Sequence, residues 1–419
     1  MGTDRAETGT DRGAGTEADP GTGTGTPAGT AAPTTAVDLV APVLREHAAA
    51  HDERATFPRE SVAALRRHGL MGLLVPSEYG GTGAGLAAFV EVAQGLSGHC
   101  LSTGQIWAMH CFQVDAIVRH GTPALKAALL PRIAAGEVYI GSVTSERGRR
   151  ADLFSADAPL DAGSGGDRLT LERDAPVVTG GDHADGYLIT MRASPTARPH
   201  EVSLVYADRT DLQIETAGEW DALGMRATES IGMKLKGTVP AHNVVGVPGR
   251  FADVARQSMV PLSHLGWSAC WLGAARGALR DLLRWQAASG GGRGRDGGPS
   301  ELSSERIGRV RISLELVSAY LTRVREEVER ARSGGSGMDG PRGQIQLNTL
   351  KIAAADLTFE AVDRMVQIAG LRTGYLKNSE LALERHFRDL RSASLNHAND
   401  ALTVGVGALS MLDRGVTLI

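Results

Sequence analysis

The sequence has few cysteines and no excess of basic residues. Its 419 residues include three widely spaced cysteines, Cys100, Cys111 and Cys270. This spacing fits neither a disulfide framework nor a metal-ligand motif, and it predicts a protein of the reducing cytoplasm. The formal net charge is −4 and no basic stripe stands out, so we expect no nucleic-acid partner.

Long apolar runs are missing too. No stretch approaches the roughly 18–20 apolar residues that a membrane-spanning helix needs, so we expect no membrane association. The N-terminal residues 1–36 lack the apolar segment of a signal peptide and are rich in Gly, Thr, Ala and acidic residues. Such a segment cannot bury enough surface to offset its chain entropy, and we predict a disordered tail.

Several well-known catalytic and nucleotide-binding motifs are absent. The chain contains no HExxH or paired CxxC motif, no G-x-S-x-G nucleophile elbow and no Walker loop. The glycine-rich string GTGTGTPAG lies in the tail and is low in complexity, so it does not indicate a dinucleotide-binding turn. We therefore expect no metal site and no nicotinamide-binding Rossmann domain.

The hydrophobic pattern changes twice after the tail. Residues 37–138 and 251–419 have apolar positions at helical spacing, whereas residues 139–250 contain about seven short segments rich in β-branched residues. The sequence therefore predicts an α+β multidomain protein with an N-terminal helical domain, a middle antiparallel β-domain and a C-terminal helical bundle. Near the end, RDLRSASLNHANDAL (residues 388–402) looks like one helix with His397 in its middle.

Several strings then occur in the order typical of one known family. GLMGLLVPSEYGGTG (residues 69–83) is similar to its "GL-x-G-x-x-x-P-x-x-YGG-x-G", and WDALGMRATES (residues 220–230) to its "W-x-x-x-GMR-x-T-x-S". QIAGLRTGY followed by LERHFRDLR is similar to "Q-x-x-GG-x-GY … ER-x-x-RD-x-R". On these strings the chain resembles the acyl-CoA dehydrogenases over residues 37–411.

The resemblance implies a fold and a chemistry. The family has an N-terminal helical domain, a middle β-domain and a C-terminal four-helix bundle, and it binds FAD between the last two, usually as a homodimer or homotetramer. The implied reaction is oxidation of an acyl thioester, on CoA or an acyl-carrier protein, to the α,β-unsaturated product. An electron acceptor would then reoxidise the flavin.

Five positions are implied to contact the flavin. Ser145 stands at the family threonine that bonds the pyrimidine edge, and Thr179 at a threonine near N5. Gln367 and Gly370 match the segment that meets the flavin of a neighbouring subunit, and Asn399 stands near the flavin phosphates. FMN, or reduced flavin delivered by a reductase, is the alternative cofactor, because several of the family's flavin contacts are missing.

Four further residues are candidates for substrate contact or for support of the site. His110, in WAMHC, could be a second histidine facing the flavin, and Arg149 could bind phosphate. Arg226 belongs to the GMR string. Ser263, next to His264, stands where some members carry the catalytic base on the first bundle helix.

His397 stands where most members have the catalytic glutamate, nine residues after the arginine of the "RD" pair. Three interpretations remain open. His397 is the base of an acyl-thioester dehydrogenase, since a neutral imidazole accepts protons near pH 7. Alternatively, the chain is a two-component flavin monooxygenase of this fold that oxidises an aromatic, amine or sulfur substrate, with a partner flavin reductase. The third is a non-catalytic homologue, in which His397 only packs.

Overall fold

The computed structural model describes residues 33–148, 152–163, 165–289, 300–334, 338–377, 379–416 and 418. Most of the predicted tail, residues 1–32, lies outside this range. Its last four residues do not belong to a tail, because the first helix, α1 (Pro33–Arg54), already begins at Pro33. Val37 and Val40 of this helix are buried, and burial of such apolar side chains favours the helix over disorder.

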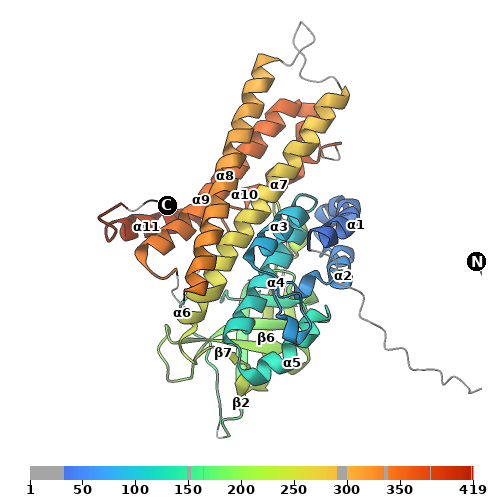
Figure 1. The fold of residues 1–419 in the computed structure, drawn as a ribbon. Helices are drawn as coiled ribbons and strands as arrows, with labels where there is room; N and C mark the ends of the chain where they lie inside the picture. The colour runs from blue at the N-terminus through green and yellow to red at the C-terminus, as the bar shows by residue number, and fades with distance from the viewer. Residues whose placement is uncertain are drawn as a thin grey trace, which may run out of the picture. The chain divides into compact units, whose positions relative to one another are not determined.

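The first part of the described chain is helical, as predicted (Figure 1). Its helix α4 contacts both α3 and the later helix α7, and most of its side chains are buried. At the start of α5, the Thr122 hydroxyl accepts a hydrogen bond from Leu125 N, a common N-terminal cap. The helices after α1 are α2 (Arg59–Arg67), α3 (Leu86–Ser97), α4 (Leu101–His120) and α5 (Pro123–Ala134).

The middle part forms two sheets, with strand orders β1-β3-β4-β7 and β2-β6-β5. The pairs are antiparallel except β1 with β3, which run parallel. The register of β2 against β6 shifts between Ala175 and Val178, an irregularity of the kind that redirects side chains. The strands are β1 (Ile140–Val143), β2 (Arg168–Val178), β3 (Gly186–Arg192), β4 (Val202–Asp208), β5 (Leu212–Ala217), β6 (Ile231–Pro240) and β7 (Val244–Val245).

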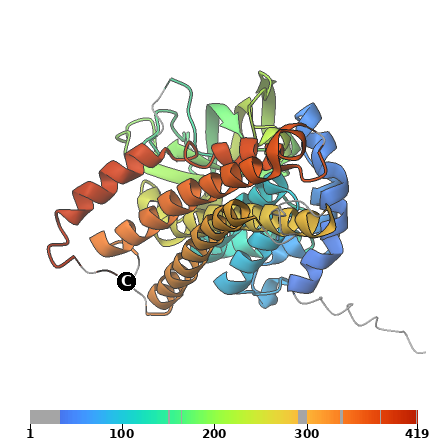
Figure 2. The ribbon, with the colours of Figure 1, turned by 90° about the horizontal axis from the view of Figure 1, so that it is seen from above.

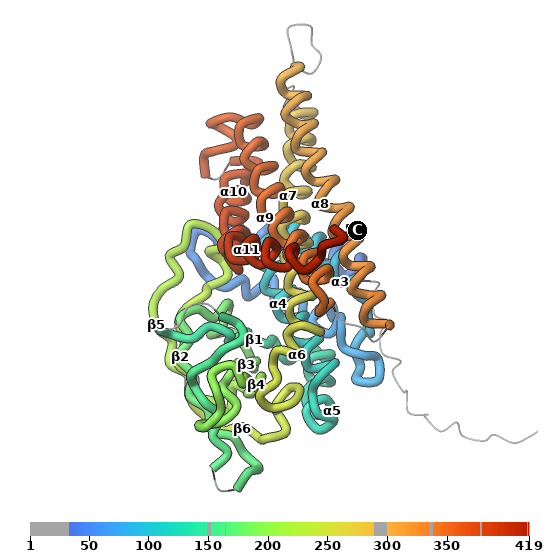
Figure 3. Tube along the Cα trace, turned by 90° about the vertical axis from the view of Figure 1, so that its left-hand side faces the viewer, coloured from blue at the N-terminus to red at the C-terminus, as the bar shows by residue number. Residues whose placement is uncertain are grey.

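The last part is a bundle of long helices, which Figures 1 and 3 show rising from the sheets. Helix α9 contacts α7, α8, α10 and α11, so its predicted apolar stripe lies in the bundle core. Figure 2 shows α11 and α1 on opposite sides of the bundle. The helices are α6 (Phe251–Val254), α7 (Val260–Ser289), α8 (Glu301–Ser333), α9 (Pro341–Gly370), α10 (Leu383–Arg391) and α11 (Asn399–Ser410). None of the helices in the described ranges is long and apolar enough to cross a bilayer.

The prediction of one helix through residues 388–402 is wrong. Helix α10 ends at Arg391, residues 392–398 form turns, and α11 begins at Asn399. The Ser392 hydroxyl donates to Asp389 O over 2.6 Å, and such local bonds compete with helix continuation. His397 has φ 50°, in the left-handed region, and therefore lies in the turn between two helices.

Candidate functional site

The turn that carries His397 is held by a buried lysine. Lys351, on α9, is 0% exposed, and its Nζ donates to Ala393 O over 3.0 Å and to His397 O over 2.7 Å. A third bond runs to Asn399 Oδ1 over 2.7 Å, and the Asn399 amide in turn donates to Asp356 Oδ1 over 2.8 Å. Burial lowers the pKa of Lys351 to about 8, so the ammonium is still charged at pH 7.

The His397 ring packs beside an indole. Its centroid lies 5.4 Å from that of Trp267, with the planes inclined by 36°. His397 as a whole is exposed, although its ring packs against Trp267. This partial burial, followed by repulsion from the Lys351 ammonium, lowers the pKa of His397 below its ordinary value. The imidazole is therefore neutral at pH 7.

A second imidazole flanks the same indole. His264 lies on α7 with its ring centroid 6.2 Å from that of Trp267, and it is buried. His264 Nδ1 lies 2.9 Å from Val260 O and donates to it, while Nε2 has no hydrogen-bond partner among the described residues. Burial, then repulsion from His397, lowers the pKa of His264 to about 3. The Ser263 hydroxyl also bonds Val260 O, so that side chain faces its own helix.

The turn that carries His397 and the helix turn that carries Ser263 and His264 thus meet around Trp267, and a neutral imidazole stands at the first place of the base and next to the second. Neither His264 nor His397 contacts a carboxylate in the parts of the chain that the structure describes. Two neutral imidazoles can accept or donate hydrogen bonds to a bound molecule without adding charge. His264 Nε2 and Trp267 Nε1 are buried polar atoms with no partner in the described part of the chain, and a bound ligand or water would satisfy them.

The proposed flavin-edge residues lie together at the irregular end of β2. The Ser145 hydroxyl donates to Val177 O over 3.0 Å, and Val177 is 46% exposed. The Thr179 hydroxyl accepts from the Ser230 hydroxyl over 3.1 Å. Because Thr179 accepts this bond, its own proton remains available to donate. A half-buried hydroxyl donor beside an exposed apolar side chain fits the polar edge and flat face of a flavin ring.

A chain of hydroxyl groups connects Thr179 with the bundle. The Ser230 and Thr228 hydroxyls are 2.8 Å apart, and Thr228 Oγ1 donates to Met225 O over 2.8 Å. Met225 N donates in turn to Asp389 Oδ1, on α10, over 2.6 Å. Burial, then the nearby Asp52 charge, raises the pKa of Asp389 to about 6. The GMRATES loop therefore joins the proposed flavin edge to the helix that leads into the His397 turn.

Two of the predicted support residues are committed to the fold. Arg226 Nε donates to Asp52 O, at the end of α1, over 2.8 Å, which fastens the GMR loop to α1. His110 Nε2 lies 3.0 Å from Met71 O, and Ile140 N donates to His110 Nδ1 over 3.1 Å. Both nitrogens of this buried imidazole are occupied, and burial lowers its pKa to about 4. His110 and Arg226 thus have structural contacts, and their roles at the site stay predictions.

Gln367 and Gly370 lie apart from these groups, at the end of α9. The Gln367 amide donates to Asp363 Oδ2 over 2.8 Å, and no atom of the described residues lies within 4 Å of the place where a Gly370 Cβ would be. The next residue, Leu371, is 71% exposed. This end of α9 is open in the single chain, so its role in holding a neighbouring subunit's flavin remains a prediction. Arg149 lies outside the described residues.

Sequence reasoning missed two buried cations. Lys351 interrupts the apolar stripe of α9, and Arg173 occupies an inward position of β2 between Leu171 and Ala175. Arg173 pairs with Glu146 over 2.9 Å and donates to Ser145 O over 3.1 Å, which holds the loop after β1. A charged residue inside an otherwise apolar face was the available signal, because burying an ion without partners is too costly to occur.

Two family models and several known proteins are similar to the chain. The family model described as acyl-CoA dehydrogenase, N-terminal domain, matches residues 28–137, and the model described as acyl-CoA dehydrogenase, C-terminal domain, matches residues 265–400. The probable acyl-CoA dehydrogenase fadE25 of Mycobacterium leprae is 26% identical over 356 residues, which cover 82% of this chain and 85% of that protein.

Two further similarities lie on the monooxygenase side of the same fold. The dibenzothiophene monooxygenase of Mycolicibacterium goodii is 25% identical over 364 residues, covering 82% of this chain and 84% of that protein. The crystal structure of FMN-bound TdsC from Paenibacillus sp. A11-2 superposes with a TM-score of 0.79 at 20% identity, covering 91% of this chain and 98% of that one. At this identity the superposition shows a shared fold.

Proposed function

The chain belongs to the acyl-CoA dehydrogenase family of flavin oxidoreductases, and on that premise we propose that it is a flavin-dependent monooxygenase of this fold. One observation carries the proposal: the neutral imidazole of His397 occupies one position of the family's base beside the buried Lys351 ammonium, and at the other position Ser263 stands next to the neutral imidazole of His264. Reduced FMN or FAD from a separate reductase would supply the electrons and the reaction with oxygen.

The physical argument concerns what happens when a substrate excludes water from the site. Desolvation raises the pKa of a carboxylate and makes it a stronger base, but it lowers the pKa of an imidazole and makes it a weaker one. At His397 the nearby Lys351 ammonium opposes an imidazolium further. A histidine here is therefore poorly suited to remove an α-proton from a thioester, and well suited to hydrogen-bond as a neutral group.

The roles of the chain's residues follow from their contacts. His397 would hydrogen-bond the reacting group, and Lys351 would hold the turn that positions it. His264 Nε2 would accept a hydrogen bond from a proton-bearing group of the bound molecule, because the Nδ1–H of the same ring already donates to Val260 O. Thr179 and Ser145 would bond the ring edge of the flavin.

The substrate class would be an aromatic, amine or sulfur compound. The similarity to a dibenzothiophene monooxygenase supports this class. Trp267, with Phe112 packed edge-on at 6.0 Å between ring centroids, gives the region an aromatic wall. We also infer that the chain acts in the cytoplasm. A homodimer or homotetramer is a separate inference, since α11 is rich in apolar residues yet has no buried residue in the single chain.

The experiment compares flavin states, so it does not require the substrate to be known. Oxidised and photoreduced FMN and FAD are titrated anaerobically into the full-length chain, followed by fluorescence and absorbance. We expect reduced flavin to bind at least tenfold more tightly than oxidised flavin, with butyryl-CoA having no effect. A yellow protein holding stoichiometric FAD that an acyl thioester bleaches without oxygen would refute the proposal.

Acyl-thioester dehydrogenation is the second candidate. It is favoured by the 26% identity to a probable acyl-CoA dehydrogenase and by the docking of the GMRATES loop onto α10, a region that retains the family strings. In that case His397 would be the base, with a thioester of CoA or an acyl-carrier protein as substrate and an electron acceptor as partner. The bleaching outcome above is the result that this candidate requires.

A further inference from the structure

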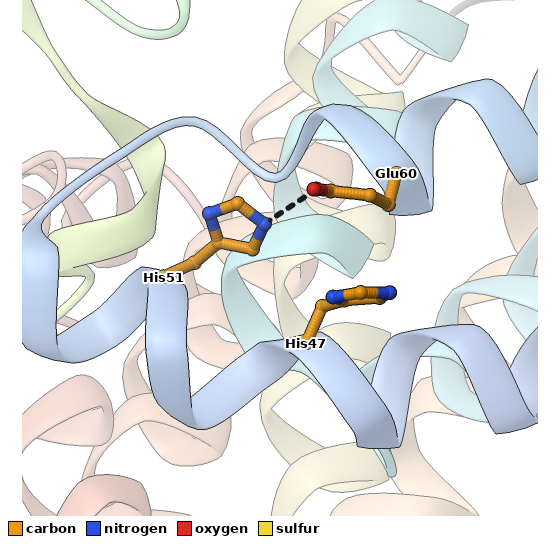
Figure 4. Close-up of side chains that lie close together, drawn as sticks. All are labelled: His47, His51 and Glu60. Carbon is orange, nitrogen blue, oxygen red and sulfur yellow. Dashed lines mark hydrogen bonds and ion pairs between the residues drawn. The ribbon is translucent and has the colours of Figure 1, made fainter.

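Two histidines and a glutamate converge at the packing of α1 against α2, away from the groups described above. His47 and His51 lie one turn apart on α1, and Glu60 lies in the first turn of α2 (Figure 4). One potential ligand atom from each residue can be chosen so that all three lie within 4.8 Å of one another. Residues four apart on a helix share a face, which is why both imidazoles reach the same place.

His51 is already oriented as a metal ligand would be. It is 5% exposed, its Nδ1 lies 2.9 Å from Thr56 Oγ1, and its Nε2 lies 2.7 Å from Glu60 Oε2. A histidine ligand usually has its second ring nitrogen bonded to a fixed partner, which sets the tautomer and the ring plane. Thr56 can serve in both states, because a hydroxyl either donates to Nδ1 or accepts from it.

We propose that His47, His51 and Glu60 form a binding site for a divalent transition-metal ion of the zinc class. Two imidazoles and one carboxylate are a ligand set that suits such ions, with water completing a tetrahedral shell. The ion binds His51 Nε2 in place of its proton. The neutral imidazole then carries its one proton on Nδ1, and this Nδ1–H donates a hydrogen bond to Thr56 Oγ1. Glu60 binds as the carboxylate.

Glu60 is prepared for that role. Its own backbone N–H bond and then the His51 bond lower the pKa of this carboxyl, so it is ionised across the neutral range. The His47 ring is 6.2 Å from the His51 ring between centroids and is partly exposed, so it can turn toward a shared ion. The site therefore needs only side-chain adjustment.

The position of the site gives the ion a structural consequence. Asp52 is the residue after His51. Its carbonyl oxygen accepts a hydrogen bond from Arg226 over 2.8 Å, and its carboxylate accepts one from Arg388 over 2.6 Å. These contacts fasten α1 to the GMR loop and to α10. An ion at His51 would brace the end of α1 that receives them. No sequence motif indicated the site, because Glu60 joins the pair only across the turn between two helices.

The test uses the tag-free full-length chain with Zn²⁺ in calorimetry and Co²⁺ in visible absorption. We expect one saturable equivalent and a rise in the thermal midpoint with Zn²⁺. His47→Ala and Glu60→Gln should each weaken Zn²⁺ binding at least tenfold. His200→Ala, which changes an exposed histidine elsewhere, should leave binding unchanged.

Three results would overturn the site. The first is that Zn²⁺ does not bind at a single saturable site. The second is that His200→Ala weakens Zn²⁺ binding as much as the site variants do. The third is that His47→Ala weakens Zn²⁺ binding and Glu60→Gln does not, which would reduce the site to a helical histidine pair. Circular dichroism confirms that each variant is folded. His51 is not the primary variant, because it also straps α1 to α2 through Glu60. None of these outcomes bears on the proposed oxygenase function, since no group is shared with it.

Discussion

Lys351 Nζ donates to the backbone oxygen of His397 over 2.7 Å, from a side chain with no exposed surface. The bond joins the middle of α9 to the turn between α10 and α11. Because His397 has a positive φ, its backbone is held in a conformation that most residues avoid. The lysine thus fixes the geometry of the histidine and also acts on its charge.

Replacing Lys351 by Met should loosen this turn. Three oxygen acceptors lose their donor, and we expect a loss of about 1–3 kcal/mol in the free energy of unfolding. Removal of the ammonium should raise the pKa of His397, because one cause of its lowering disappears. Urea unfolding measures the first effect, and NMR titration of the His397 ring, assigned with a His397 variant, measures the second.

Lys234→Met provides a matched control, since Lys234 is exposed on β6. It should change neither quantity. An unchanged His397 pKa in Lys351→Met would show that the ammonium does not act on the imidazole.

Replacing His397 by Asn should separate the effect of losing the imidazole from the effect of disturbing the backbone turn. Asparagine tolerates a positive φ better than most residues, so the turn is expected to persist. Turnover should fall roughly a hundredfold, the usual size of the loss when a hydrogen-bonding group at the reacting atoms is removed, while flavin affinity stays within about threefold. Steady-state oxygen uptake and flavin titration give the two readouts. Full turnover in this variant would remove His397 from the reaction.

Asp389 should make the protein less stable as pH rises through weakly acidic values. Its folded pKa of about 6 lies above the ordinary value of 3.8 for an aspartic acid, so the folded state binds the proton more tightly between these values. The contribution of the Asp389 carboxyl to the free energy of unfolding is fully present below about pH 4 and is lost as the pH rises through 6.

Asp389→Asn keeps an oxygen that can accept from Met225 N and removes the charge. The variant should therefore gain stability relative to the parent as pH rises from about 4 to 6, by about 3 kcal/mol for a buried carboxyl, and then stay level. Urea unfolding at a series of pH values measures this difference. A pH-independent difference would mean that the carboxyl is not held protonated.

Gly224 should not tolerate a side chain. A Cβ at this residue would lie 2.0 Å from Arg388 O, in the contact between the GMR loop and α10. Gly224→Ala should undock the loop from α10 and lower the free energy of unfolding by about 3–4 kcal/mol. Gly308→Ala is the control, because no atom of the residues that the structure describes lies within 4 Å of its Cβ position on α8, and helix propensity there favours alanine. Thermal unfolding of both variants makes the comparison, and equal midpoints would contradict it.

Much of the fold follows from local pattern. The change from helical to strand spacing and back indicates two helical parts around two sheets, because periodic apolar positions must face a core. The prediction of one helix at residues 388–402 is wrong because a distant residue, Lys351, supplies the donors that hold a turn there. A single-sequence pattern contains no information about that partner.

The sequence by itself determined the family, the order of the elements and the presence of a histidine where a carboxylate is usual. Only the tertiary structure brought His264 and His397 together at Trp267 and gave His110 and Arg226 their hydrogen-bond partners within the fold. The physical reason is that identity and spacing are local properties, whereas burial, pKa and hydrogen-bond partners depend on residues that meet only after folding.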